Sequence, residues 1–166
     1  MTPTRTFDLL ERAITLFPGN QALSEKIEGQ WVFYTSEQYH EIAHQFAYGL
    51  LEMGYKKGDK IVTITNNRPQ WNFVDLGMAM AGVVHVPVYT SMNAEVYRYV
   101  LQHSDAKMVL VADQKLHDLI YPISQEVKGV KHYFTFDPIE GAPRWLEVVE
   151  KGKAAGDNIH KELEEI

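Results

Sequence analysis

The chain has 166 residues, no cysteine and a formal net charge of −6, with 16 Lys and Arg against 22 Asp and Glu. One domain is expected, because domains usually hold about 100–150 residues and 45% of this chain is hydrophobic. The lack of cysteine excludes a disulfide framework, a thiolate zinc site and a cysteine nucleophile. The acidic balance argues against a nucleic-acid binder. Neither a membrane-spanning apolar run nor the apolar core of a secretory signal is visible, so a cytoplasmic protein is expected.

The first 35 residues predict a helix and a β-hairpin. Residues 7–17 carry apolar side chains at helical spacing, and Pro and Gly at 18–19 end that helix. Two β-like runs follow at 22–27 and 31–34. Glu-Gly-Gln at 28–30 predicts a tight turn between them, with glycine at a positive φ.

A long helix is predicted from Thr35 onward. Thr35 and Gln38 have the spacing of a capping box. Gly54 takes the position at which helices commonly end. The apolar face of this helix holds Tyr39, Ile42, Ala43, Phe46, Leu50 and Met53.

Strands and helices then alternate to about residue 136. Pro69 at a first helical position, and Asn93 and Asp113 as N-caps, mark the helix starts. The predicted strands are 60–65, 83–88, 107–112 and 130–136, and the helices between them are 69–82, 94–103 and 114–127. Because crossover helices connect parallel strands, an α/β three-layer sandwich with a mostly parallel sheet is expected.

The pattern weakens after residue 138. A helix at 144–151, a loop at 153–156 and a charged helical beginning at 160–166 are expected there. The chain thus divides into three parts: the N-terminal helix and hairpin (1–35), a βαβ parallel-sheet subdomain (36–137) and a C-terminal helical tail (138–166).

Residues 40–44 read His-Glu-Ile-Ala-His and match the H-E-x-x-H zinc motif, in which the glutamate acts as a general base. The extended motif needs Gly and His where this chain has Ala and Leu, and no Glu lies within 53–75 to act as a third ligand. His40 and His44 also fall at the polar boundary of the apolar helix face. We therefore expect no metal ligands, and a zinc hydrolase using His40, Glu41 and His44 is the least favoured alternative.

Other phosphate-binding and catalytic motifs do not fit. Residues 54–60 have the composition of a phosphate loop, but they connect a helix to a strand, the reverse of a P-loop. Neither G-x-G-x-x-G nor G-x-S-x-G occurs.

Polar turns follow three of the predicted strands, at 65–68, 89–93 and 113–115. Ligands of open α/β sheets collect at this edge, and each turn also opens a helix whose backbone N–H groups could meet an anion. The alternative is that Asn, Ser and Asp serve there only as helix caps.

Five segments carry recognisable patterns: residues 33–39, 54–62 ("G-x-x-K-G-D-x-V"), 66–71 ("N-x-x-x-W"), 81–89 ("A-G-x-x-x-V-P-x-Y") and 104–107. These segments resemble the adenylate-forming acyl-CoA synthetases, and their order and spacing agree with that family across about residues 5–135. The Val-Pro-Val-Tyr-Thr and Asn-Asn-Arg-Pro-Gln-Trp forms look most like the long-chain fatty-acid–CoA ligases.

The resemblance implies the N-terminal part of an AMP-forming ligase, which converts a fatty acid and ATP to an acyl-adenylate and transfers the acyl group to CoA. ATP, Mg²⁺ and CoA would be needed by the full-length enzyme. The resemblance also places Thr90, Ser91, Lys115 and His117 towards the CoA side.

The family's other motifs are missing from the 166 residues: the phosphate loop, the adenine motif, the ribose-binding Asp, the hinge and the catalytic Lys. The resemblance places all of them further along a full-length ligase. We therefore expect no catalytic residue here, no cofactor for this part alone, and no activity by itself.

A second interpretation is a non-catalytic, truncated α/β interaction module. Under either interpretation no nucleic acid and no transmembrane segment is expected. A fatty-acid substrate suggests at most a peripheral encounter with membranes. Apolar surface that a longer protein would cover is expected to make the isolated chain self-associate.

Overall fold

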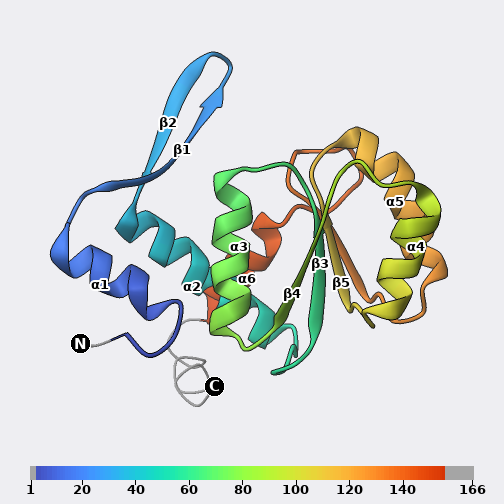
Figure 1. The fold of residues 1–166 in the computed structure, drawn as a ribbon, viewed down its shortest axis with the longest axis horizontal. Helices are drawn as coiled ribbons and strands as arrows, with labels where there is room; N and C mark the ends of the chain where they lie inside the picture. Colours follow the sequence, from blue (N-terminus) through green and yellow to red (C-terminus); the bar gives the residue numbers. More distant parts are fainter. Residues whose placement is uncertain (1–2, 156–166) are drawn as a thin grey trace.

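The computed structural model describes residues 3–155 (Figure 1). Helices and strands alternate as the sequence predicts, and most of their bounds agree to within two residues. In chain order they are α1 (Asp8–Leu16), β1 (Gln21–Ile27), β2 (Gln30–Thr35), α2 (Ser36–Glu52), β3 (Lys60–Ile64), α3 (Pro69–Met80), β4 (Val84–Val88), α4 (Ala94–His103), β5 (Met108–Val111), α5 (Gln114–Glu126), β6 (His132–Thr135) and α6 (Leu146–Ala155).

Two separate sheets are present in the described part of the chain. Four strands form a wholly parallel sheet in the order β4-β3-β5-β6. Strands β1 and β2 form an antiparallel hairpin, which extends away from the rest of the protein in Figure 1. The expected four-stranded parallel sheet preceded by a small hairpin is thus confirmed.

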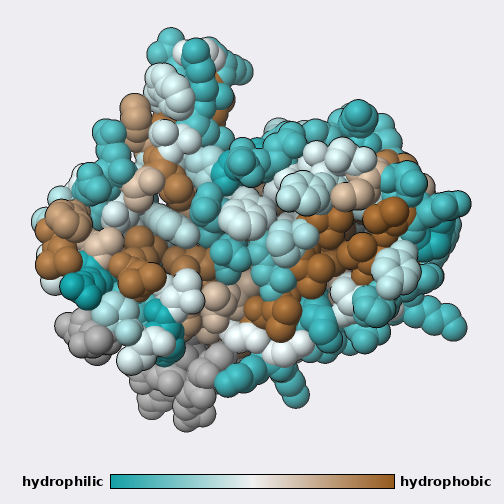
Figure 2. Space-filling view, viewed as in Figure 1, coloured by the Kyte–Doolittle hydropathy of each residue, from teal (hydrophilic) through white to brown (hydrophobic). Residues whose placement is uncertain are grey.

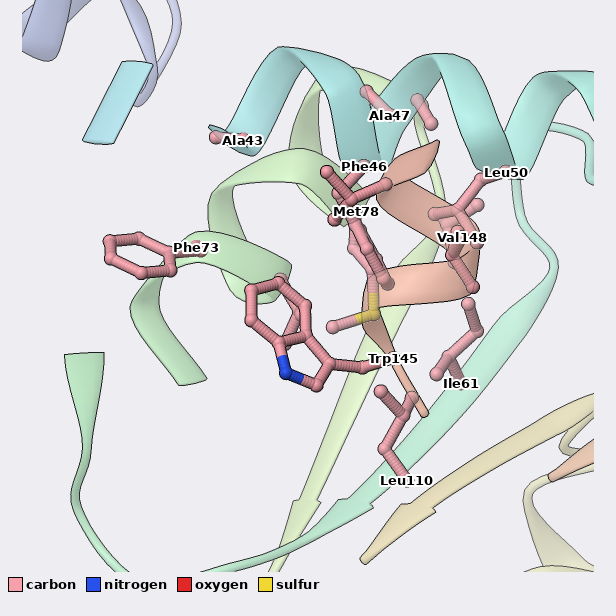
Figure 3. Close-up of a cluster of buried hydrophobic side chains, with 14 of the residues drawn as sticks. Ala43, Phe46, Ala47, Leu50, Ile61, Phe73, Met78, Leu110, Trp145 and Val148 are labelled. Atoms are coloured by element: carbon pink, nitrogen blue, oxygen red, sulfur yellow. The ribbon is translucent and has the colours of Figure 1, made fainter. Parts of the chain in front are cut away.

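The parallel sheet is covered by helices on both faces, which makes the three layers that the sequence predicts (Figure 1). Side chains alternate along β3, because successive residues of a strand point to opposite faces. Ile61 belongs to the core shared with α2, α3 and α6, whereas Val62 and Ile64 belong to the core shared with α4 and α5. Figure 3 shows Trp145 beside Met78, close to Ile61 and Leu110 of the sheet.

Helix α6 packs very closely against α2. A Cβ atom built on Gly152 would lie 1.8 Å from the carbonyl oxygen of Gln45, and one on Gly49 would lie 1.9 Å from that of Val148. Only glycine permits such an approach of two helix backbones. The segment predicted as a tail therefore contributes α6 and the buried Trp145 to the core.

Local signals in the sequence account for the element boundaries. Thr35 and Gln38 form the predicted capping box at the start of α2. Asn93 and Asp113 cap α4 and α5 through their side-chain oxygens. In the hairpin turn, Gly29 has the expected positive φ of 84°.

Two expectations for the C-terminal part have different outcomes. The loop predicted at 153–156 is wrong for residues 153–155, because α6 continues to Ala155. The helical beginning predicted at 160–166 lies outside the described residues. Within the described part, no helix combines the length and the apolar character that crossing a membrane would need.

Candidate functional site

The carboxyl edge of the parallel sheet carries a small cavity of about 320 Å³. Strand β3 lies between β4 and β5, so the winding of the chain reverses at β3. In open α/β sheets, ligands bind outside the strand ends at such a reversal. The cavity is lined by Asn66, Thr90, Ser91, Met92, Asp113, Lys115, Leu116 and Leu119, which come from the turns after β3, β4 and β5 and from the first part of α5.

Hydrogen bonds hold part of this cavity in place. The Thr90 hydroxyl donates to Oδ1 of Asn66 at 3.1 Å, which joins the turns after β3 and β4. Asp113 accepts the backbone N–H of Leu116 at 2.9 Å and so caps α5. Lys115 is exposed at the same helix start and forms no ion pair with a described residue. A cation, two hydroxyls and a helix N-terminus are groups that can hold a phosphate.

The structure brings together three of the four residues predicted for the CoA side. Thr90, Ser91 and Lys115 line the cavity, but His117 does not. The ring of His117 faces β6, with Nδ1 3.2 Å from the hydroxyl of Tyr133. It also stacks on Tyr121, with the ring centroids 5.2 Å apart. Burial raises the pKa of Tyr133, so its phenol stays protonated beside His117.

A partly buried chain of hydrogen-bonded polar side chains, which periodicity alone did not reveal, joins α3, β3 and β4 near this edge. His85 Nδ1 is 2.6 Å from Oδ1 of Asp75, and His85 Nε2 is 2.7 Å from the Thr63 hydroxyl. The ring of Trp71 lies 5.2 Å from that of His85. These are the group types of a hydrolytic triad, but Thr63 is only 1% exposed. These hydrogen bonds therefore fix α3, which carries Asp75, against β3 and β4.

A second network joins the hairpin to the sheet. Arg68 donates to Asp137 at 2.7 Å and to Gln70 at 2.9 Å, and Gln70 in turn donates to Glu25 of β1 at 2.6 Å. Glu25 also accepts the Tyr34 hydroxyl at 2.7 Å. Burial and the Glu25 carboxylate raise the pKa of Tyr34 to about 12. These residues line a cavity of about 640 Å³ beside α6.

The two histidines of the H-E-x-x-H segment lie beside a carboxylate that comes from outside the motif. Glu11 of α1 lies beside them, with its Oε1 4.0 Å from Nε2 of His40. One ligand atom from each of Glu11, His40 and His44 lies within 4.8 Å of the others. Burial, and secondarily His44, lower the pKa of His40. The expectation of no metal ligands rested partly on the lack of a further candidate at residues 53–75, and in the structure the nearby carboxylate comes from an earlier helix.

The sequence profile of the AMP-binding enzyme family matches residues 10–160. The chain belongs to the AMP-binding enzyme family. Among its relatives, the long-chain-fatty-acid–CoA ligase ACSBG2 of Xenopus laevis is 25% identical over 163 residues, which cover 95% of this chain and 22% of that protein. FadD15 of Mycobacterium tuberculosis, also a long-chain-fatty-acid–CoA ligase, is 34% identical over 91 residues, covering 55% of this chain and 15% of that protein.

Solved structures show that the fold is that of the N-terminal domain of adenylate-forming enzymes. The long-chain-fatty-acid–CoA ligase FadD1 from Archaeoglobus fulgidus aligns with a TM-score of 0.76 at 18% identity, over 90% of this chain and 30% of that one. The anthranilate CoA ligase AuaEII, in complex with anthranoyl-AMP, aligns with a TM-score of 0.77 at 22% identity, over 88% and 28%. The matched part of this member of the AMP-binding enzyme family thus covers only 15–30% of these proteins.

Proposed function

We propose that this chain is the N-terminal part of a long-chain fatty-acid–CoA ligase. The observation that carries the proposal is the family match over residues 10–160, with long-chain ligases among the relatives. In such an enzyme the fatty-acid carboxylate attacks the α-phosphorus of ATP and releases pyrophosphate. The CoA thiol then displaces AMP from the acyl-adenylate. Positioning and charge stabilisation supply most of the catalysis in phosphoryl chemistry, and Mg²⁺ would shield the triphosphate.

The residues at the carboxyl edge of the sheet fit a phosphate of CoA. Lys115 offers a positive charge and Ser91 a hydroxyl donor, and the Thr90 hydroxyl could donate if it exchanged its bond to Asn66. A Mg²⁺-bound triphosphate would instead need several carboxylates and cations, and Asp113 is the cavity's one acidic lining residue. ATP and Mg²⁺ would therefore be held by other parts of the full-length enzyme. His117 would not contact the phosphate, because its ring lies outside this cavity and bonds Tyr133 instead.

The chain as given is proposed to be inactive by itself. The proposal follows from the family resemblance, which places the phosphate loop, the adenine motif and the catalytic Lys outside these 166 residues. In the Thr63–His85–Asp75 hydrogen-bond chain the would-be nucleophile, Thr63, is 1% exposed.

A non-catalytic interaction module remains the second candidate, because the hairpin presents exposed aromatic rings. Trp31 and Phe33 stack with their centroids 6.4 Å apart, and neither is covered by another described element. Such a surface suits a protein partner.

Reading the gene beyond codon 166 separates the two candidates. A downstream phosphate-loop sequence is expected, and the longer product should form acyl-CoA from a long-chain fatty acid, ATP and CoA. Calorimetry of the 166-residue chain should show no tight ATP binding. This measurement separately tests whether the chain is inactive by itself. A stop codon after 166 would favour the interaction module, and tight ATP binding by the short chain would contradict the proposed placement of the nucleotide site.

A further inference from the structure

We propose that Glu11, His40 and His44 form a binding site for a zinc-type divalent metal ion, which fastens α1 to α2. The three side chains come from two different helices, with one carboxylate on α1 and two imidazoles on α2. Two imidazoles and one carboxylate make a donor set that suits zinc. This site is independent of the ligase function proposed above.

The ligand atoms already converge. All three lie within 4.8 Å of one another, and Glu11 Oε1 is 4.0 Å from His40 Nε2. The two imidazole rings stand one helical turn apart, with centroids separated by 4.0 Å. Because residues four apart share a helix face, both rings point towards α1.

One ring is oriented for metal binding by the helix itself. Nδ1 of His44 lies 3.1 Å from the carbonyl oxygen of His40. Since a carbonyl only accepts hydrogen bonds, Nδ1 of His44 donates in this contact, and a metal would be bound through Nε2. Metal-ligating histidines typically have their other ring nitrogen held in this way.

A small movement completes the geometry. Donor atoms around a tetrahedral zinc are about 3.3–3.6 Å apart, given zinc bonds of about 2.0–2.2 Å. The Glu11 side chain is 43% exposed and the His40 side chain 30% exposed, so the carboxylate can swing inward without disturbing the core. Water would take the fourth position.

The site is suited to joining helices rather than to hydrolysis. Glu41, the general base in an H-E-x-x-H hydrolase, instead accepts a hydrogen bond from Gln45 at 2.9 Å and is exposed. Helix α1 needs an additional attachment, because Asp8 is its one buried residue and its N-terminus lacks a side-chain cap. A bridging metal would restrain the one helix that burial holds weakly.

Titration of the tag-free, metal-free 166-residue chain with Zn²⁺, and with Co²⁺ as a spectroscopic probe, tests the proposal. One equivalent of either ion should bind, and Co²⁺ should give visible bands of tetrahedral intensity. Glu11→Gln, His40→Gln and His44→Gln should each weaken binding by at least about 10- to 100-fold, the loss typical when even the hydrogen-bond partners of ligands are removed. Glu41→Gln and His103→Gln are the controls and should bind normally, because neither residue belongs to the cluster.

Thermal stability and amide exchange test the same site if the affinity of the chain for zinc is modest. Saturating Zn²⁺ should raise the melting temperature of the unmutated chain and slow amide exchange in α1, because the site exists only when α1 is docked. The three ligand variants, checked by circular dichroism for an intact fold, should lose both effects. Less than stoichiometric binding, or equal binding by the ligand variants and the controls, would overturn the proposal.

Discussion

The parallel-sheet body and the N-terminal hairpin are stabilised in different ways. Every residue of β5 is buried, and the helices α2 and α6 touch through glycines. In the hairpin no residue of β1 or β2 is fully buried, and Trp31 and Phe33 are 60% and 48% exposed. The body is thus held by extensive apolar burial, whereas the hairpin combines polar bonds near Glu25 with the partly buried Leu23 and Tyr34.

The largest loss of stability is expected from a substitution where α2 and α6 pack most closely. Gly152→Ala places a Cβ 1.8 Å from the Gln45 carbonyl oxygen, so α6 must move away from α2. We expect a loss of about 3 kcal/mol in the free energy of unfolding, despite a gain of about 1 kcal/mol in helix propensity. Urea unfolding measures this loss.

A matched glycine provides the control for that variant. A Cβ on Gly129 would meet its nearest neighbour, the carbonyl oxygen of Ala106, at 3.4 Å, which is close to an ordinary contact. Gly129→Ala should therefore change stability little. If both variants unfolded at the same urea concentration, the close packing of α2 and α6 would be contradicted.

Two arginines compare the polar attachment of the hairpin with an ordinary surface ion pair. Arg68 bonds Asp137 and Gln70 and lies over the Phe136 ring, and its side chain is 20% exposed. Arg68→Ala should cost about 1–2 kcal/mol, since hydrogen bonds to charged groups contribute about 1.5–3 kcal/mol and partial exposure reduces this. Urea unfolding and amide exchange of β1 and β2 should both report the loss.

Arg98 is the control for this substitution. It pairs with Glu126 at 3.0 Å on the exposed surface of α4 and α5. Arg98→Ala should cost less than about 0.5 kcal/mol, because exposed ion pairs contribute little. Equal losses for the two arginines would mean that the Arg68 network does not attach the hairpin.

The exposed surface of the hairpin predicts self-association of the isolated chain. Figure 2 shows apolar residues at the surface around α1 and between β4 and α4, and the stacked Trp31 and Phe33 add an exposed aromatic pair on β2. The double variant Trp31→Ser, Phe33→Ser should lower the apparent mass in light scattering at high concentration. Tyr99→Ser, which removes an equally exposed ring from α4, is the control. A monomeric unmutated chain at high concentration would contradict this prediction.

Sequence reasoning predicted the body better than its polar clusters. Helix and strand signals are local: Thr35 and Gln38 lie three residues apart, and the alternation of Ile61 and Val62 follows from strand geometry. The carboxylate beside His40 of α2 is Glu11, which comes from α1. The carboxylate beside His85 of β4 is Asp75, which comes from α3.

No periodicity shows which side chains of separate helices will meet. The carboxylate nearest to His40 therefore lies far from residues 53–75, where the zinc motif would place a further ligand. The separation of His117 from Lys115 has a local cause that could have been foreseen, because residues two apart on a helix point in different directions.

The smallest change in stability is expected for a substitution in the attachment of α1. This change should depend on pH. Asp8 accepts hydrogen bonds from the backbone N–H groups of Thr4 and Arg5 at 2.9 Å, and also from their side chains. These bonds, led by that from Thr4, lower the pKa of Asp8 from 3.8 to about 2. A carboxylate with a lowered folded-state pKa contributes stability above its unfolded pKa and loses it as pH falls through the folded value.

Asp8→Asn should therefore lower the melting temperature at pH 6, and the difference from the unmutated chain should narrow as pH falls from about 4 towards 2. Asp118→Asn, which removes an exposed carboxylate from α5, should show no such convergence. A difference for Asp8→Asn that stayed constant over this range would mean that Asp8 acts through packing and not through its charge. Convergence would show that α1, unlike the buried strands, is held by a charge that acid can remove.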